Sequence, residues 1–359
     1  MKRSVGALLV GTAAGMAGLG AGVAAQRYAV RRIRAGPDAE AGEDLAERPG
    51  RERRAASFDG TGLAVNVAGP AEGPTVVFVH GFSLDMTVWH YQWKRLSERY
   101  RCVLFDQRGH GRSDVASGGD YSLEALGRDL KAILDALAPE PPVVLVGHSM
   151  GGMAIMSFAA LYPEEFGPRV GGVVLANTAA AEIFKEILGG LGGRLGAFFV
   201  PYPRAVLGEP GRLYRLRSRS LQHRIGLAFL VARFSNFGPG APPSLVDHVL
   251  NLAARTPPGV WTDVFRSMME MDLGHALRHI TVPALVVVGD VDRLTPPSSA
   301  LAIKRMLPEA RMVVMRGAGH CAMLERHEQF TDLLEEFLGG ALAPGPEAVA
   351  RASTPMART

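Results

Sequence analysis

The chain is poor in cysteine, since only Cys102 and Cys321 occur among its 359 residues. Two cysteines cannot supply the disulfide framework of a small secreted scaffold. An excess of one charge is also nearly absent, because 39 Lys and Arg residues against 35 Asp and Glu residues give a formal net charge of +4. So small an excess argues against a nucleic-acid-binding surface. His, Cys, Asp and Glu residues nowhere show the spacing of metal ligands, so the sequence predicts neither a metal nor another cofactor.

Strand-like and helix-like patterns alternate along most of the chain. The strand-like runs lie at 54–58, 63–67, 75–81, 101–106, 142–147, 172–177, 284–290 and 311–315. The helix-like patterns lie near 85–98, 122–137, 150–162, 297–307 and 324–338. Nearly continuous apolar strands are typical of a parallel sheet that helices cover on both faces. We therefore expect an α/β fold with a doubly wound, mostly parallel sheet.

The alternation stops between residues 181 and 275, which hold helical patterns but no strand pattern. We interpret 181–275 as a helical cap inserted over the carboxyl ends of the strands. The core then comprises 55–180 and 276–340. Residues 27–54 are polar and of mixed charge, which predicts a linker, and 341–359 have the composition of a disordered tail.

The first 26 residues contain an uncharged stretch from position 5 to position 25. Its 21 residues are long enough to cross a bilayer as a helix. Residues 1–26 therefore predict a membrane anchor and a membrane-associated protein, with a secretory signal cleaved near Ala25 as the alternative. Positive charges stand on both sides of the stretch, so the side of the membrane stays open. They are Lys2, Arg3, Arg27, Arg31, Arg32 and Arg34.

The sequence G-H-S-M-G-G at 147–152 follows a strand-like run and opens a helical pattern. G-x-S-x-G in this setting forms a nucleophile elbow, whose sharp turn places Ser149 at the top of the sheet. The next amide, that of Met150, lies at a helix N-terminus, where the helix dipole favours developing negative charge. Phe82 in the H-G-F sequence ends an earlier strand-like run near the same edge. The pattern predicts Ser149 as the nucleophile and the amides of Phe82 and Met150 as an oxyanion hole.

A serine hydroxyl needs a histidine to take its proton, and that histidine needs a carboxylate to orient it. His320 follows the last strand-like run, while Asp290 and Asp292 follow the run before it. The chain order Ser, Asp, His is the one expected for a hydrolase built on this kind of sheet. His80 comes at the wrong place for a base, so we interpret it as structural.

The sequence resembles the α/β-hydrolase fold superfamily over about residues 55–340. The shared motifs are H-G-F at 80–82, D-Q-R-G-H-G-R-S at 106–113, G-H-S-M-G-G at 147–152, G-D-V-D-R-L-T-P at 289–296 and G-A-G-H at 317–320. The resemblance implies that Ser149 is the nucleophile, His320 the general base and acid, and Asp292 the orienting acid, with Asp290 as a minor alternative. It also implies that His110 and His148 are not catalytic.

A serine nucleophile argues against an epoxide hydrolase or a dehalogenase, which attack carbon with a carboxylate. We expect a serine hydrolase that cleaves a small hydrophobic ester through an acyl-enzyme. A thioesterase acting on an acyl carrier, and a cofactor-free perhydrolase or haloperoxidase, are alternatives on the same triad. A membrane-tethered binding protein without catalysis is the alternative of a different class. Residues that would line an apolar acyl pocket, or would simply pack, are Phe198, Phe199, Trp261, Phe265, Met268 and Met269.

Overall fold

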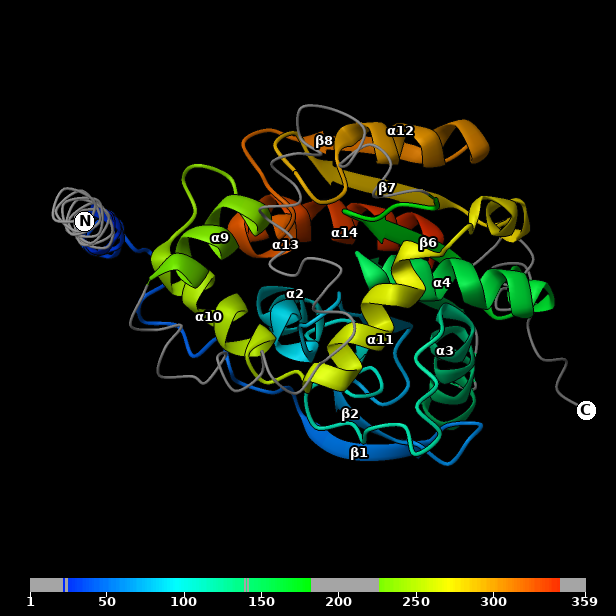
Figure 1. The fold of residues 1–359 in the computed structure, drawn as a ribbon. Helices are drawn as coiled ribbons and strands as arrows, with labels where there is room; N and C mark the ends of the chain where they lie inside the picture. The colour runs from blue at the N-terminus through cyan, green and yellow to red at the C-terminus, as the bar shows by residue number, and fades with distance from the viewer. Residues whose placement is uncertain (1–21, 23–24, 139, 141, 182–225, 343–359) are drawn as a thin grey trace, which may run out of the picture.

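The computed structural model describes residues 22, 25–138, 140, 142–181 and 226–342 (Figure 1). Most of the predicted membrane segment, part of the predicted cap (with Phe198 and Phe199) and residues 343–359 of the predicted tail lie outside these residues. Within the described ranges, no helix is long and apolar enough to cross a membrane. The membrane anchor and the signal peptide therefore both stay predictions.

An eight-stranded sheet forms the centre of the molecule, with the order β1-β2-β4-β3-β5-β6-β7-β8. Pairing is antiparallel between β1 and β2 and between β2 and β4, and parallel across the rest of the sheet. This confirms the expected mostly parallel sheet. The strands are β1 (Arg51–Ala56), β2 (Gly62–Ala68), β3 (Thr75–Val79), β4 (Arg101–Phe105), β5 (Val143–His148), β6 (Val170–Ala176), β7 (Ala284–Gly289) and β8 (Arg311–Met315).

Helices cover both faces of the sheet. Successive side chains of each strand point to opposite faces, so one strand can contribute to two apolar clusters. In β3, Val77 and Val79 join one apolar cluster with α3, α4 and α12. Val76 and Phe78 join a second cluster with α2, α13 and α14. The helices are α2 (His90–Leu96), which follows a short 3₁₀ turn η1 (Met86–Trp89), then α3 (Leu123–Leu137), α4 (Met150–Leu161), α12 (Pro297–Met306), α13 (Ala322–Glu325) and α14 (His327–Ala341).

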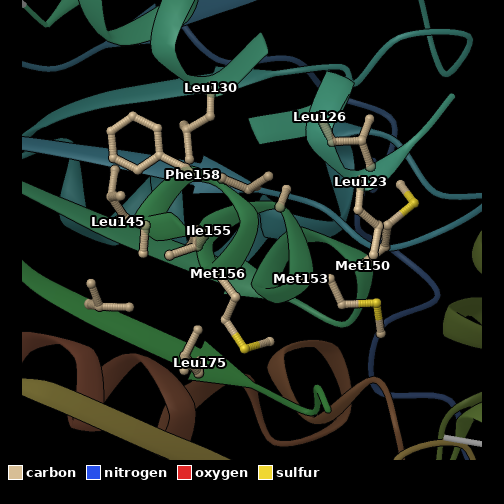
Figure 2. Close-up of a cluster of buried hydrophobic side chains, with 14 of the residues drawn as sticks. Leu123, Leu126, Leu130, Leu145, Met150, Met153, Ile155, Met156, Phe158 and Leu175 are labelled. Atoms are coloured by element: carbon tan, nitrogen blue, oxygen red, sulfur yellow. The ribbon is translucent and has the colours of Figure 1, made fainter. Parts of the chain in front are cut away.

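Helix α4 is buried on nearly all sides, which makes it a rigid support for the residue at its N-terminus. Figure 2 shows Ile155, Met156 and Phe158 of α4 in one cluster with Leu130 of α3 and Leu145 of β5. All five side chains are fully buried. Such burial of large apolar groups stabilises the helix by about 1.5–3 kcal/mol for each side chain, so the start of α4 is held firmly against the end of β5.

Between β6 and β7 the described residues are mainly helical, as the sequence predicts for 181–275. The longer helices are α9 (Leu227–Asn236), α10 (Pro243–Ala253) and α11 (Pro258–Met269), and a 3₁₀ turn η3 (Gly274–His279) follows. The two ends of this insertion meet, because Leu273 N–H donates to the carbonyl of Ala180 at 2.7 Å. An isolated antiparallel bridge between Ala181 and Asp272 continues the same contact.

The N-terminal region departs from the sequence-based expectation of a linker over 27–54. Residues 25–34 are helical, and β1 begins at Arg51 rather than near residue 54. Val30 and Leu45 are both buried in the second apolar cluster. Charged side chains of this region pair with partners on the core, for example Glu43 with His90 at 3.0 Å. We call residues 25–50 the N-terminal strap, since some of their side chains contact the core while many others stay exposed.

Candidate active site

Ser149 occupies a sharp turn between β5 and α4, in the conformation of a nucleophile elbow. Its φ of 52° and ψ of −118° are strained for a residue other than glycine. The turn is tight because α4 starts against the end of β3, where a Cβ on Gly151 would lie 2.1 Å from the carbonyl oxygen of Val79. Only glycine therefore fits at position 151. The backbone N–H of Ser149 donates to Ala176 at 3.0 Å, which ties the turn to β6.

His320 and Asp292 meet at the same edge of the sheet, on the loops that follow β8 and β7. The Nδ1–H of His320 donates to Asp292 Oδ2 at 2.9 Å, and Asp292 Oδ1 lies 3.2 Å from the same nitrogen. Both side chains are buried. The rings of His320 and His148 lie 4.8 Å apart between centroids, and His148 directly precedes Ser149. The structure thus brings His320 next to the chain segment that carries Ser149.

Asp290, the alternative acid, points elsewhere. Its Oδ1 accepts a hydrogen bond of 2.7 Å from the backbone N–H of Gly317, at the exposed surface. Of the two carboxylates that follow β7, it is Asp292 that contacts the imidazole of His320.

Asp292 is held by more hydrogen bonds than the sequence analysis anticipates. Asn177 Nδ2 and Thr295 Oγ1 each donate to Oδ2 at 2.8 Å, while the backbone amides of Leu294 and Thr295 donate to Oδ1 at 2.8 and 3.0 Å. Burial by itself would raise the pKa of Asp292, but His320 and these donors outweigh it and lower the pKa to about 2. Asp292 is therefore a stable anion at neutral pH.

The two predicted oxyanion donors, the amides of Phe82 and Met150, flank Ser149. Met150 is the first residue of α4, where a helix leaves its N–H groups without intrahelical partners. Among the described residues, neither amide has a recorded acceptor. Gly81 brings the Phe82 loop close to Ser149, because a Cβ at position 81 would lie 3.1 Å from the Cβ of that residue. Both amides are therefore available to an oxygen bound beside Ser149.

Comparisons with known proteins agree with the fold. A family profile described as alpha/beta hydrolase fold matches residues 74–327, which is well over half of the chain. The chain belongs to the α/β hydrolase fold family. A 2-hydroxy-6-oxononadienedioate/2-hydroxy-6-oxononatrienedioate hydrolase of Paraburkholderia phymatum is 32% identical over 287 residues, which cover 78% of this chain and 92% of the relative.

Two further relatives are esterases by name. A pimeloyl-[acyl-carrier protein] methyl ester esterase of Aeromonas hydrophila is 27% identical and covers 77% of this chain and 100% of its own length. A solved structure of a thermophilic esterase from Thermogutta terrifontis has a TM-score of 0.64 and 25% identity, over 81% of this chain and 99% of that one.

The other histidines near the site of this α/β hydrolase are structural. His80 Nδ1–H donates to the carbonyl of Gly81 at 2.8 Å, and its Nε2 accepts the N–H of Gln107 at 2.9 Å, as expected for a loop histidine. His148 Nε2–H donates to the carbonyl of His320 at 2.9 Å. Burial lowers the pKa of His80 to about 4 and that of His148 and His110 to about 3. These three rings are neutral at pH 7, and their polar contacts go to the backbone.

Proposed function

We propose that this α/β hydrolase is a serine hydrolase that cleaves hydrophobic carboxylic esters through an acyl-enzyme, with Ser149, His320 and Asp292 as its triad. The single observation that carries the proposal is the 2.9 Å hydrogen bond between His320 Nδ1 and Asp292 Oδ2. It fixes the tautomer in which Nε2 is the basic nitrogen. The low pKa of Asp292 supports the same role, because an anion stabilises the imidazolium that forms when His320 takes the serine proton.

The proposed reaction uses these groups in turn. His320 Nε2 takes the proton of Ser149 as Oγ attacks the ester carbonyl, and the amides of Phe82 and Met150 stabilise the oxyanion. Imidazolium returns the proton to the leaving alcohol. Water, activated by the same imidazole, attacks the acyl-enzyme and releases the acid. The strained turn at Ser149, directly before α4, is consistent with a nucleophile at this position.

An aromatic wall beside the oxyanion loop supports a hydrophobic substrate. The ring of Phe82 lies 5.4 Å from that of Trp261 on α11, and Trp261 stacks on Phe265 with centroids 5.0 Å apart and planes 12° apart. Since Phe82 also supplies an oxyanion amide, a substrate carbonyl bound there would lie close to this wall. The esterases named among the relatives support an ester as the reactive group.

A thioester of an acyl carrier, or a peracid, would be processed by the same groups, so the test uses graded substrates. We expect the full-length chain in detergent to hydrolyse p-nitrophenyl esters and to react with a fluorophosphonate, which labels only an activated serine. Ser149→Ala should fold normally and lose both activities. Acyl thioesters of matched chain length separate a thioesterase from an esterase, and the absence of fluorophosphonate labelling would indicate a binding protein without catalysis.

A further inference from the structure

Arg48, the last charged residue of the N-terminal strap, is mostly buried next to the end of the loop that carries Phe82. Its Nη2 lies 3.0 Å from Asp85 Oδ2 and its Nη1 lies 3.0 Å from Asp106 Oδ2. The side chain of Arg48 is 12% exposed, and those of Asp85 and Asp106 are 3% and 0% exposed. One guanidinium therefore bridges two buried carboxylates, a geometry to which its planar, fixed array of donors is suited.

The two carboxylates hold the end of the loop that carries Phe82. Asp85 closes this loop, and its Oδ1 accepts the N–H of Thr87 at 2.9 Å. Asp106 Oδ1 accepts the N–H of Met86 at 2.8 Å. The loop has a left-handed residue in its middle, Ser83 with a φ of 58°. Because that conformation is strained, the loop depends on its attachments to keep its shape.

The start of the same loop, at His80, is attached to Gln107, the residue that follows Asp106. Its backbone N–H donates to His80 Nε2 at 2.9 Å, and its side-chain amide donates to the carbonyl of His80. The chain at 106–107 thus holds both ends of the loop, but the contact with Asp85 runs through Arg48. Arg48 lies outside the matched family region of 74–327, so this attachment belongs to the strap.

We propose that Arg48 is a positioning residue that sets the oxyanion amide of Phe82 by bridging Asp85 and Asp106. The proposal rests on the proposed serine hydrolase activity. Without Arg48, two buried carboxylates would face each other with no cation between them, and like charges at such a distance repel. Asp85 would move away from Asp106 and would take the end of the Phe82 loop with it.

The charge balance of this cluster is consistent with the role of Arg48. Burial and the neighbouring Asp85 raise the pKa of Asp106, Arg48 lowers it, and the net result is a pKa of about 6. Arg48 is thus the cation that favours the ionised form of Asp106. Removal of Arg48 would either leave a carboxylate protonated or displace the loop, and either change would disturb the attachment of the Phe82 loop to the core.

The strap also reaches the helices between β6 and β7, so it links them to the oxyanion loop. Asp38 accepts both the N–H and the hydroxyl of Ser244, at 2.9 and 2.7 Å, at the N-terminus of α10. Val30 packs closely on Gly226 at the start of α9. The strap thus contacts α9 and α10 at one end and, through Arg48, the core next to the Phe82 loop at the other.

The test compares Arg48→Met, Arg48→Lys and the control Arg51→Met in the full-length chain. Arg51 is an exposed arginine of β1, so its substitution should leave kcat and KM unchanged. We expect Arg48→Met to lower kcat by about 10- to 100-fold with little change in KM, because a misplaced catalytic group affects the transition state most. Arg48→Lys should recover part of kcat, since a lysine keeps the charge but cannot form both contacts in the same plane.

A boronic acid inhibitor separates positioning from a general loss of stability. It adds to Ser149 Oγ and places an oxygen in the oxyanion hole, so its Ki should rise in parallel with the loss of kcat in Arg48→Met. The double variant Arg48→Met with Asp85→Asn should recover thermal stability together with part of kcat and Ki, because the unpaired buried charge and its repulsion of Asp106 are both removed.

If Arg48→Met keeps kcat and Ki within about twofold of the wild type, or if the double variant recovers stability but no part of kcat or Ki, the proposal is overturned. Should Arg48→Met fail to fold, Arg48→Lys decides alone: wild-type kcat and Ki in that variant would exclude a positioning role. If the wild-type protein itself neither labels with a fluorophosphonate nor cleaves esters, it is the proposed function that fails.

Discussion

Asn177 donates a hydrogen bond of 2.8 Å to Oδ2 of Asp292, across the junction of two neighbouring parallel strands. Asn177 directly follows β6 and Asp292 lies in the loop after β7. The same Nδ2 donates to the carbonyl of Gly319 at 3.1 Å, next to His320. One buried amide therefore connects the loops that carry the acid and the histidine of the proposed triad. Asn177 has a φ of 47°, a left-handed conformation that asparagine tolerates better than most residues.

Replacement of Asn177 should therefore lower activity through the orientation of Asp292. We expect Asn177→Ala to lower kcat by about 10-fold, the equivalent of one hydrogen bond to a charged group of roughly 1.5 kcal/mol. Asn177→Gly should lose the same kcat but remain more stable than Asn177→Ala by about 1 kcal/mol, because glycine adopts a positive φ without strain. Steady-state kinetics and urea denaturation measure the two effects. Equal stabilities of the two variants would contradict the strain argument.

The two carboxylates after β7 should differ sharply when each is neutralised. Asp292→Asn should lower kcat by a factor of about 10³ to 10⁴ while KM changes little, because the amide favours the wrong tautomer of His320. Asp290→Asn is the matched control, since Asp290 lies at the surface, where it accepts a hydrogen bond from the Gly317 amide. We expect it to retain most of the wild-type kcat. A comparable loss in both variants would show that the acid of the triad has been assigned incorrectly.

Much of the fold and of the site could be predicted from local motifs, because each motif depends on a few residues that are adjacent in the chain. The nucleophile elbow around Ser149 depends on a strand, a glycine-rich turn and a helix that are contiguous in the chain, and each appears where the sequence places it. The central strands are buried on both faces and therefore carry an unmistakable apolar pattern. The edge strand β1 starts at Arg51 and carries exposed charges, which makes an edge strand resemble a loop.

What could not be predicted depends on contacts between distant segments. Asn177 and Thr295 are single polar residues with no motif, and only the fold brings both to Asp292. Arg48 lies in a segment of polar composition that is typical of a linker. Composition shows how many charges a segment has. It does not show that Asp85 and Asp106, the partners of Arg48, are buried in the core.

Glu325 should be required for the placement of the loop that carries His320. Its carboxylate accepts the N–H of Gly238, at 2.7 Å, and the N–H of Gly319. Glu325→Gln replaces one acceptor oxygen with a donor, so one buried N–H loses its partner, at a cost of about 1–3 kcal/mol in the free energy of unfolding. Because Gly319 precedes His320, we also expect a lower kcat.

The control for this variant is Glu328→Gln, which makes the same chemical change on an exposed residue of α14. Its stability should stay within about 0.5 kcal/mol of the wild type. Chemical denaturation and steady-state kinetics of both variants measure the effect. If Glu325→Gln behaves like Glu328→Gln, the carboxylate does not hold the loop.

The buried histidines should make the protein sensitive to acid, and His110 allows the effect to be isolated away from His320. His110 is buried, and its Nδ1–H donates to the carbonyl of Arg108 at 2.9 Å. Burial lowers its pKa from 6.5 to about 3. Between these two values the unfolded chain binds a proton at this residue that the folded chain does not bind. The free energy of unfolding therefore falls as the pH drops below 6.5, by about 1.4 kcal/mol for each pH unit.

His110→Asn should remove this contribution, because asparagine does not titrate and its side-chain amide can still donate to the Arg108 carbonyl. Above pH 7 the variant should be less stable than the wild type by a constant amount, since a buried ring is lost. Between pH 6 and pH 4 that difference should shrink with each unit of acidification. Urea denaturation at several pH values measures it, with exposed His275→Asn as the control. A difference that stays constant from pH 8 to pH 4 would mean that His110 is already protonated in the folded protein or never buried from solvent.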